Sequence, residues 1–173
     1  MRERILSLRG DVEISTVGRI MDEIIAINEE DNKEEPIHLY IQSDGGVAMD
    51  AYSLVDLMLT SEIPIYTYCN SYVSSSALDI YLCGQKRFVY PHSRFLIHGV
   101  KSSFDNATLP GIKSNLENIE TIEMFGKDML IARTNLTSNQ IEKLYSKNRD
   151  IWVGYDDALK YGIATDFIPY KIN

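Results

Sequence analysis

The sequence is poor in cysteine, in basic residues and in long hydrophobic runs. Of its 173 residues only two are cysteines, Cys69 and Cys83, so neither a disulfide framework nor a zinc site is expected. No stretch approaches the ~18 uninterrupted apolar residues of a membrane span, and the first residues lack the apolar core of a signal peptide. These absences favour a cytoplasmic protein, with no metal and no cofactor expected.

The shortage of basic residues narrows the choice of partners. Seventeen Lys and Arg stand against 25 Asp and Glu, which leaves a formal net charge of −8 at pH 7. Nucleic acids and anionic membranes require clustered Lys and Arg, so neither is expected as a partner. The length and the apolar fraction of 45% are typical of one globular domain, which we expect to span residues 1–173.

Short strand-like runs alternate with longer helix-like stretches along the chain. This alternation predicts an α/β domain with a largely parallel sheet. A turn is expected over residues 70–73, between a strand and a short helix that begins near Ser74. Strands are expected at 5–8, 37–41, 65–69, 87–90, 94–97 and 163–168, and helices at 12–28, 47–59, 109–132, after 137 and at 156–161.

Three segments follow expected strands at the carboxyl edge of this sheet, where the active crevice of parallel α/β proteins lies. They are Ser43–Gly46, Asn70–Ser75 and Ile97–His98. Paired glycines in the first segment let the backbone turn and approach a ligand closely, although such a pair is also common in ordinary tight turns.

These ends carry the residue types of nucleophilic catalysis. Ser74 is expected where a strand turns into a helix and backbone N–H groups favour negative charge, but the neighbouring serines are equally suited to cap that helix. His98 is a natural general base near neutral pH. Asp150 could orient a histidine, yet 25 acidic residues leave that choice open. The residues alone therefore allow a Ser/His/Asp hydrolase without selecting one.

Taken together, the segments resemble the Clp protease proteolytic subunit over nearly the whole chain. The most specific match is Pro91–His98, which with the preceding Lys86–Phe88 is similar to the family pattern K-R-F…P-N-S-R-x-M-I-H. The other matching segments are Tyr40–Val47 (family Y-I-N-S-P-G-G-V), Val73–Ala77 (nucleophile segment A-S-M-G-A) and residues 149–163 (R-D…E-A…Y-G-L).

The resemblance implies a serine endopeptidase and assigns its residues by position. Ser74 falls on the nucleophile, His98 on the general base and Asp150 on the acid that orients it. The remaining implied positions are the oxyanion N–H groups of Gly46 and Ser75 and the substrate-binding strands at Val47, Gly99 and Val100.

The resemblance also implies an assembly. The fold would be the ClpP/crotonase-like spiral of ββα units, with a handle region at about 100–135 whose helix projects. Family members form homo-oligomers of stacked heptameric rings that enclose the active sites, and a hexameric Clp ATPase threads unfolded protein or peptide substrates into the chamber. The expected function is thus the proteolytic subunit of an ATP-dependent Clp-type protease.

Several positions depart from the family pattern and keep alternatives open. Asp44 replaces a proline, Ser76 a glycine, and His98-Gly99-Val100 a His-Gln-Pro segment. The chain begins almost at its first expected strand, and two aromatic positions of the ATPase docking pocket appear as His38 and Thr60. The alternatives are a virus-encoded head-maturation peptidase of the same family, a non-catalytic ring subunit and a crotonase-type acyl-CoA enzyme.

Overall fold

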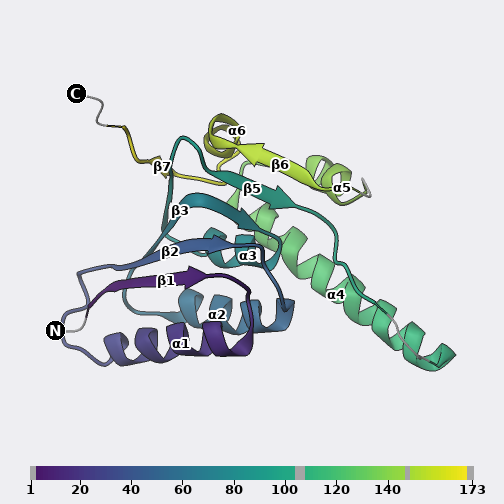
Figure 1. Ribbon diagram of the computed structural model, residues 1–173, viewed down its shortest axis with the longest axis horizontal. Coiled ribbons are helices and arrows are strands. Elements are labelled where there is room, and N and C mark those ends of the chain that lie inside the picture. The colour runs from purple at the N-terminus through teal and green to yellow at the C-terminus, as the bar shows by residue number, and fades with distance from the viewer. Residues whose placement is uncertain (1–2, 104–107, 147–148, 171–173) are drawn as a thin grey trace.

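The structure is a computed structural model, and it describes residues 3–103, 108–146 and 149–170. Within these residues a single sheet is flanked by helices, and one long helix extends away from the body (Figure 1). The strands are β1 Ile5–Arg9, β2 Ile37–Ser43, β3 Ile65–Ser74, β4 Lys86–Val89, β5 Arg94–Ile97, β6 Ile151–Gly154 and β7 Asp166–Phe167. The helices are α1 Ile14–Asn28, α2 Ala48–Thr60, α3 Ser76–Leu82, α4 Leu109–Arg133, α5 Ser138–Ser146 and α6 Tyr155–Lys160.

The sheet is largely parallel, as the alternation of strands and helices predicts. Its main path runs β1-β2-β3-β4-β7 with every pairing parallel. Strand β5 pairs in parallel with the end of β3, and only the β5–β6 pairing among the described strands is antiparallel. Cα partners Ser43↔Val73 and Ser74↔Leu96 bring the ends of β2, β3 and β5 to one edge. The predicted meeting of these three strand ends is therefore confirmed.

The turn expected over residues 70–73 is wrong, because β3 continues unbroken to Ser74. This strand changes neighbours along its length: Tyr66–Cys69 pair with β4, whereas Tyr72–Ser74 pair with β5. The polar pair Asn70-Ser71 lies between the two pairings, which explains why a strand interior looks like a turn in the sequence. Strand β6 was not expected at all.

The core lies between the sheet and the helices α1, α2 and α3. Burial in β2 alternates residue by residue, and Ile37, Leu39 and Ile41 are fully buried. The helical face that covers them repeats at the 3.6-residue period, so that Val17, Ile20, Ile24 and Ile27 of α1 are buried. Full burial of each such side chain stabilises the fold by about 1.5–3 kcal/mol.

Aromatic side chains cover part of the other face of the sheet. The Tyr68 ring stacks between Tyr40 and Phe88, with centroid distances of 4.5 and 4.6 Å. Offset-stacked pairs contribute about 0.5–1.5 kcal/mol each beyond the burial of their area. Three neighbouring strands, β2, β3 and β4, are tied together by this row.

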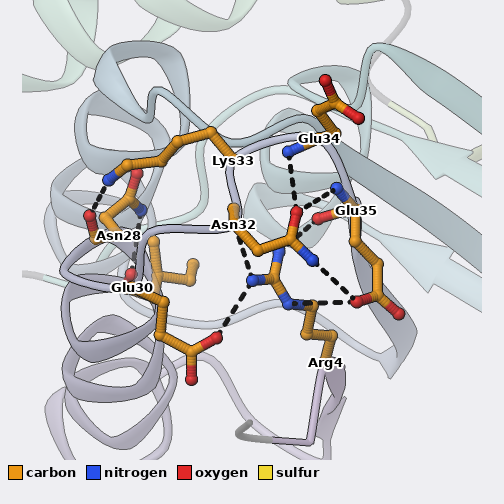
Figure 2. A network of polar contacts seen from close by, with 8 residues as sticks. Arg4, Asn28, Glu30, Asn32, Lys33, Glu34 and Glu35 are labelled. Carbon is orange, nitrogen blue, oxygen red and sulfur yellow. Dashed lines mark hydrogen bonds and ion pairs between the residues drawn. The ribbon is translucent and has the colours of Figure 1, made fainter.

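A buried arginine holds the first strand to the charged segment after α1 (Figure 2). Arg4 is 5% exposed, and its guanidinium donates to the carbonyl oxygens of Asn32, at 2.8 Å, and of Glu35. It also forms an ion pair with Glu30 at 3.0 Å. A charged hydrogen bond contributes more than a neutral one, so this network orders a segment whose composition resembles a solvated connector.

The last turns of helix α4 pack against the body and its first half projects away from it, as the handle prediction requires (Figure 1). Only Gly126 and Leu130 of this 25-residue helix are buried, both in its second half. Its start is well defined, because the Thr108 side chain accepts a hydrogen bond from the Gly111 N–H at 3.3 Å and Pro110 lies in the first turn. The apolar side chains left exposed along it are Leu109, Leu116, Met124, Phe125 and Ile131.

Candidate active site

At the edge of the sheet, the paired glycines that follow β2 contact the serines at the end of β3. Gly45 has φ +91°, and a Cβ there would lie 2.7 Å from both the Ser74 carbonyl oxygen and the Ser75 Cβ. Gly46 has φ +153°, and a Cβ there would lie 2.3 Å from the Val12 carbonyl oxygen. Glycine is therefore required at both positions, by backbone angle and by close approach.

A cavity of about 380 Å³ opens beside these turns. Ser75, Ser76 and Gly46 line it together with His98, which directly follows β5. Its other walls come from α2, α3, α4 and α5, and the polar side chains there are Tyr52, Asp79, Glu123 and Tyr145. Ser74 is not among the lining residues.

Ser75 has a strained backbone conformation. With φ +54° and ψ −133°, it is the only described non-glycine residue with a positive φ. Such a conformation costs on the order of 1–3 kcal/mol and persists only where neighbouring structure imposes it. Here the Ser75 N–H donates to the Leu96 carbonyl of β5 at 3.1 Å, and α3 begins at the next residue. A serine on a strained strand-to-helix turn is also the arrangement of the nucleophile elbow.

Ser74 has a different environment. It is 1% exposed, and its Oγ is buried without a hydrogen-bond partner among the described residues. The side chain thus belongs to the interior at the end of β3, away from the cavity that His98 lines. Ser75, and not Ser74, therefore shares a cavity with His98.

The two N–H groups expected as oxyanion donors differ in whether the chain itself uses them. The Ser75 N–H, one of the two expected donors, donates its hydrogen bond to the Leu96 carbonyl oxygen. The Ser76 N–H is the first of α3, and the first N–H groups of a helix have no carbonyl partner within it. The other expected donor, Gly46, forms an isolated β-bridge with Val12. The two hydrogen bonds of this bridge run from the Val12 N–H to the Gly45 carbonyl and from the Val47 N–H to the Val12 carbonyl, so neither uses the Gly46 N–H. Gly46 and Ser76 both line the cavity.

His98 is half-buried and held in a defined tautomer. Its Nδ1 lies 2.7 Å from the Gly99 carbonyl oxygen. Since a carbonyl oxygen can only accept, Nδ1 carries the proton of the neutral ring and Nε2 is left as the acceptor. This is the tautomer that a general base needs.

Asp150 lies near His98 but does not contact it. Its Oδ1 is 3.0 Å from Lys101 Nζ, and both side chains are largely exposed. Asp150 and His98 line a second cavity of about 430 Å³. An exposed ion pair of this kind is worth about 0–1 kcal/mol, so the carboxylate is only weakly held by Lys101.

The expected substrate-binding positions are partly occupied by the chain itself. The Val47 N–H donates to the Val12 carbonyl at 2.8 Å. The Val100 N–H donates to Glu123 Oε1 of α4 at 3.1 Å, and the Gly99 carbonyl contacts His98. A substrate backbone that pairs with Val100 must first displace the Glu123 carboxylate.

Asp79 is a feature of the cavity that sequence reasoning missed. This carboxyl group is 9% exposed and accepts a hydrogen bond from Tyr52 Oη at 3.2 Å. Burial raises its pKa to about 7, and the hydrogen bond from Tyr52 acts in the opposite direction. The same surroundings raise the pKa of Tyr145, by burial first and then by the neighbouring Asp79 charge. One signal was available: Asp79 follows Ser75 by four residues on an expected helix.

The raised pKa of Asp79 predicts how stability changes with pH. The native state holds this proton up to about pH 7, whereas the unfolded state loses it near pH 4, so wild-type stability falls as pH rises between these values. Asp79→Asn removes the titration. The free energy of unfolding of the variant, measured relative to that of the wild type, should therefore rise by on the order of 3 kcal/mol from pH 4.5 to pH 8.5. Urea unfolding at both pH values measures this, and a constant difference between the two proteins would contradict it.

Comparisons with known proteins agree on one family. A family model described as Clp protease matches residues 1–171. The chain belongs to the Clp protease family. Among its curated relatives, the ATP-dependent Clp protease proteolytic subunit of Carsonella ruddii is 28% identical over 99% of this chain and 86% of that protein. Proteolytic subunit 1 of Rhodopirellula baltica is 26% identical over 97% of this chain and 73% of that protein.

The solved structures agree on the fold of this Clp protease family member. A ClpP1 mutant from Listeria monocytogenes superposes with a TM-score of 0.84, covering 97% of this chain and 92% of that one at 20% identity. The predicted ClpP-like α/β fold is thereby confirmed. In the described part of the chain, no helix is long and apolar enough to cross a membrane. The same residues contain no cluster of metal-binding side chains.

Proposed function

We propose that this chain is a serine endopeptidase with Ser75 as its nucleophile, His98 as its general base and Asp150 as the residue that orients His98. One observation carries the proposal: a serine on a strained turn shares a cavity with a histidine whose Nε2 can accept a proton. In this proposal Ser75 takes the role that the family resemblance assigns to Ser74, and Ser76 takes the oxyanion role of Ser75. Membership of the Clp protease family supports the reaction class.

The chemistry follows from these positions. Ser75 Oγ attacks the scissile carbonyl carbon while His98 Nε2 takes the hydroxyl proton. The Gly46 and Ser76 N–H groups donate to the oxyanion of the tetrahedral intermediate. His98 returns its proton to the leaving amine as the C–N bond breaks, and a water deprotonated by His98 then attacks the acyl-enzyme ester and releases Ser75.

Asp150 completes the site only after a rearrangement. In the single chain the Gly99 carbonyl takes the His98 Nδ1 proton, and Asp150 pairs with Lys101. A carboxylate at Nδ1 stabilises the imidazolium form better than a carbonyl does, so exchange of these partners would raise activity. We propose that packing against neighbouring subunits drives this exchange.

The proposed working form is a homo-oligomer that encloses its active sites. The exposed apolar side chains of α4 support it, because a single chain leaves them in water. The family name of the curated relatives supports a Clp-type ATPase as the partner that delivers unfolded substrates.

An active-site probe tests the reaction class. A fluorophosphonate reacts with an activated serine, and we expect one phosphonyl group per chain on Ser75, identified by mass spectrometry of the labelled peptide. Absence of label on any serine in the native oligomer would contradict the proposal and favour a non-catalytic ring subunit. Label on Ser74 would restore the family-based assignment.

A further inference from the structure

The cavity beside Ser75 ends in an acidic, buried wall. Asp79 lies four residues after Ser75, in the first turns of α3. At about 1.5 Å of rise per residue, it lies about 6 Å further along the helix axis. Tyr52 of α2 and Tyr145 of α5 line the same end of the cavity. Ser75, the proposed nucleophile, and the Asp79 carboxylate thus lie at opposite ends of the same cavity.

Nothing in the fold requires a carboxylate at this place. Asp79 has one side-chain hydrogen bond, from Tyr52, and forms no ion pair with any described lysine or arginine. A buried carboxylate without a cation is destabilising, and an apolar side chain would fill the same volume at lower cost. A group that the fold holds at such cost is typical of a binding site.

Helix α4 approaches this end of the cavity closely at a buried glycine. Gly126 of α4 faces it, and a Cβ at that position would lie 2.8 Å from Tyr145 Oη and 3.9 Å from Asp79 Oδ2. Tyr145 Oη, Tyr52 Oη and the Asp79 carboxylate therefore converge on one spot next to Gly126. Together they offer three hydrogen-bond acceptors and one negative charge.

We propose that this end of the cavity binds the side chain of the residue that precedes the cleaved bond, and that it selects lysine. The proposal rests on Ser75 being the nucleophile. If Ser75 attacks the carbonyl carbon of a substrate residue, the side chain of that same residue is the one nearest the cavity that Ser75 and Asp79 line. A lysine side chain spans about 6 Å when extended, and its ammonium group carries three donors for the three acceptors. Arginine presents a planar fork that suits a bidentate carboxylate better than this convergent set.

Peptides that differ at one residue test the proposal. Fluorogenic amides carry lysine, arginine, norleucine, leucine or glutamate before the cleaved bond, and norleucine is the uncharged match for lysine. At pH 8.5, where Asp79 is ionised, we expect the native oligomer to cleave the lysine peptide about 10- to 100-fold faster in kcat/KM than the norleucine peptide. Equal or inverted rates would overturn the proposal without any variant.

Two substitutions locate the effect. Asp79→Leu should reverse the preference, so that norleucine and leucine peptides are cleaved faster than lysine, and Asp79→Asn should remove most of it. Asp56→Asn, at an exposed acidic residue of α2, is the matched control and should retain the lysine preference. A lysine preference that survives Asp79→Leu would overturn the role of Asp79.

Labelling separates this proposal from the one on which it rests. Fluorophosphonate labelling of Ser75 is measured in each variant alongside hydrolysis. A labelled enzyme with no lysine preference refutes only the specificity of the cavity. An enzyme that neither labels at Ser75 nor cleaves any peptide refutes the proposed function, and the specificity with it.

Discussion

Replacement of Ser75 by alanine is expected to lower peptide hydrolysis by on the order of 10⁴-fold or more, with the fold and the oligomer intact. The reason is the loss of the nucleophile, since triad residues act as a unit and little covalent catalysis survives the removal of one. The turn itself favours a residue that tolerates φ +54°, so alanine there costs some stability but fits the space. Initial rates with a fluorogenic peptide measure the effect, with circular dichroism and sedimentation as checks on fold and assembly.

Ser74→Ala is the matched control, because it makes the same chemical change one residue earlier. Its hydroxyl is buried without a partner, so its removal should leave turnover within a few-fold of wild type. It should also raise the free energy of unfolding by about 1 kcal/mol, because an unsatisfied buried polar group is lost. Loss of activity in Ser74→Ala with activity retained in Ser75→Ala would overturn the assignment and return the nucleophile to Ser74.

The sequence predicted where the candidate site lies, but it did not predict which serine shares a cavity with His98. Three strand ends were expected to meet, and the β2–β3 and β3–β5 pairings bring them together. Residues 74–76 are three consecutive serines, so neither composition nor spacing distinguishes them. What distinguishes them is a backbone angle and a hydrogen bond to Leu96, and both depend on where β3 ends. The turn expected over residues 70–73 predicts an end of this strand several residues before its observed end at Ser74.

Contacts between distant segments were beyond the reach of sequence patterns. The sequence analysis did not single out Asp79, a buried carboxyl group that shares its cavity with residues of α2 and α4. Arg87 was expected only as part of a strand, yet it is buried and donates to the carbonyl oxygens of Gly162 and Ile163, at 2.8 Å each. Burial lowers the pKa of this guanidinium without neutralising it. Such partners become visible only when the chain is folded.

The exposed side of α4 leads to a second large effect. Leu116 is 48% exposed and lies in the part of the helix that leaves the sheet. Leu116→Glu should leave the single chain folded, because the side chain contributes little to its core. In the proposed oligomer the same change places a carboxylate in an apolar contact that repeats in every subunit, which costs several kcal/mol at each copy. We therefore expect dissociation to small species in sedimentation velocity.

Peptide hydrolysis should fall with the assembly, by at least about tenfold, because Asp150 in the single chain pairs with Lys101 and not with His98. Asn118→Glu adds the same charge to an exposed polar position of α4 and should leave both mass and activity close to wild type. Fluorophosphonate labelling of each sedimenting species then shows whether the loss arises at Ser75. A dissociated Leu116→Glu protein with wild-type hydrolysis would contradict the coupling of assembly to the active site, and an unchanged mass would contradict the role of α4.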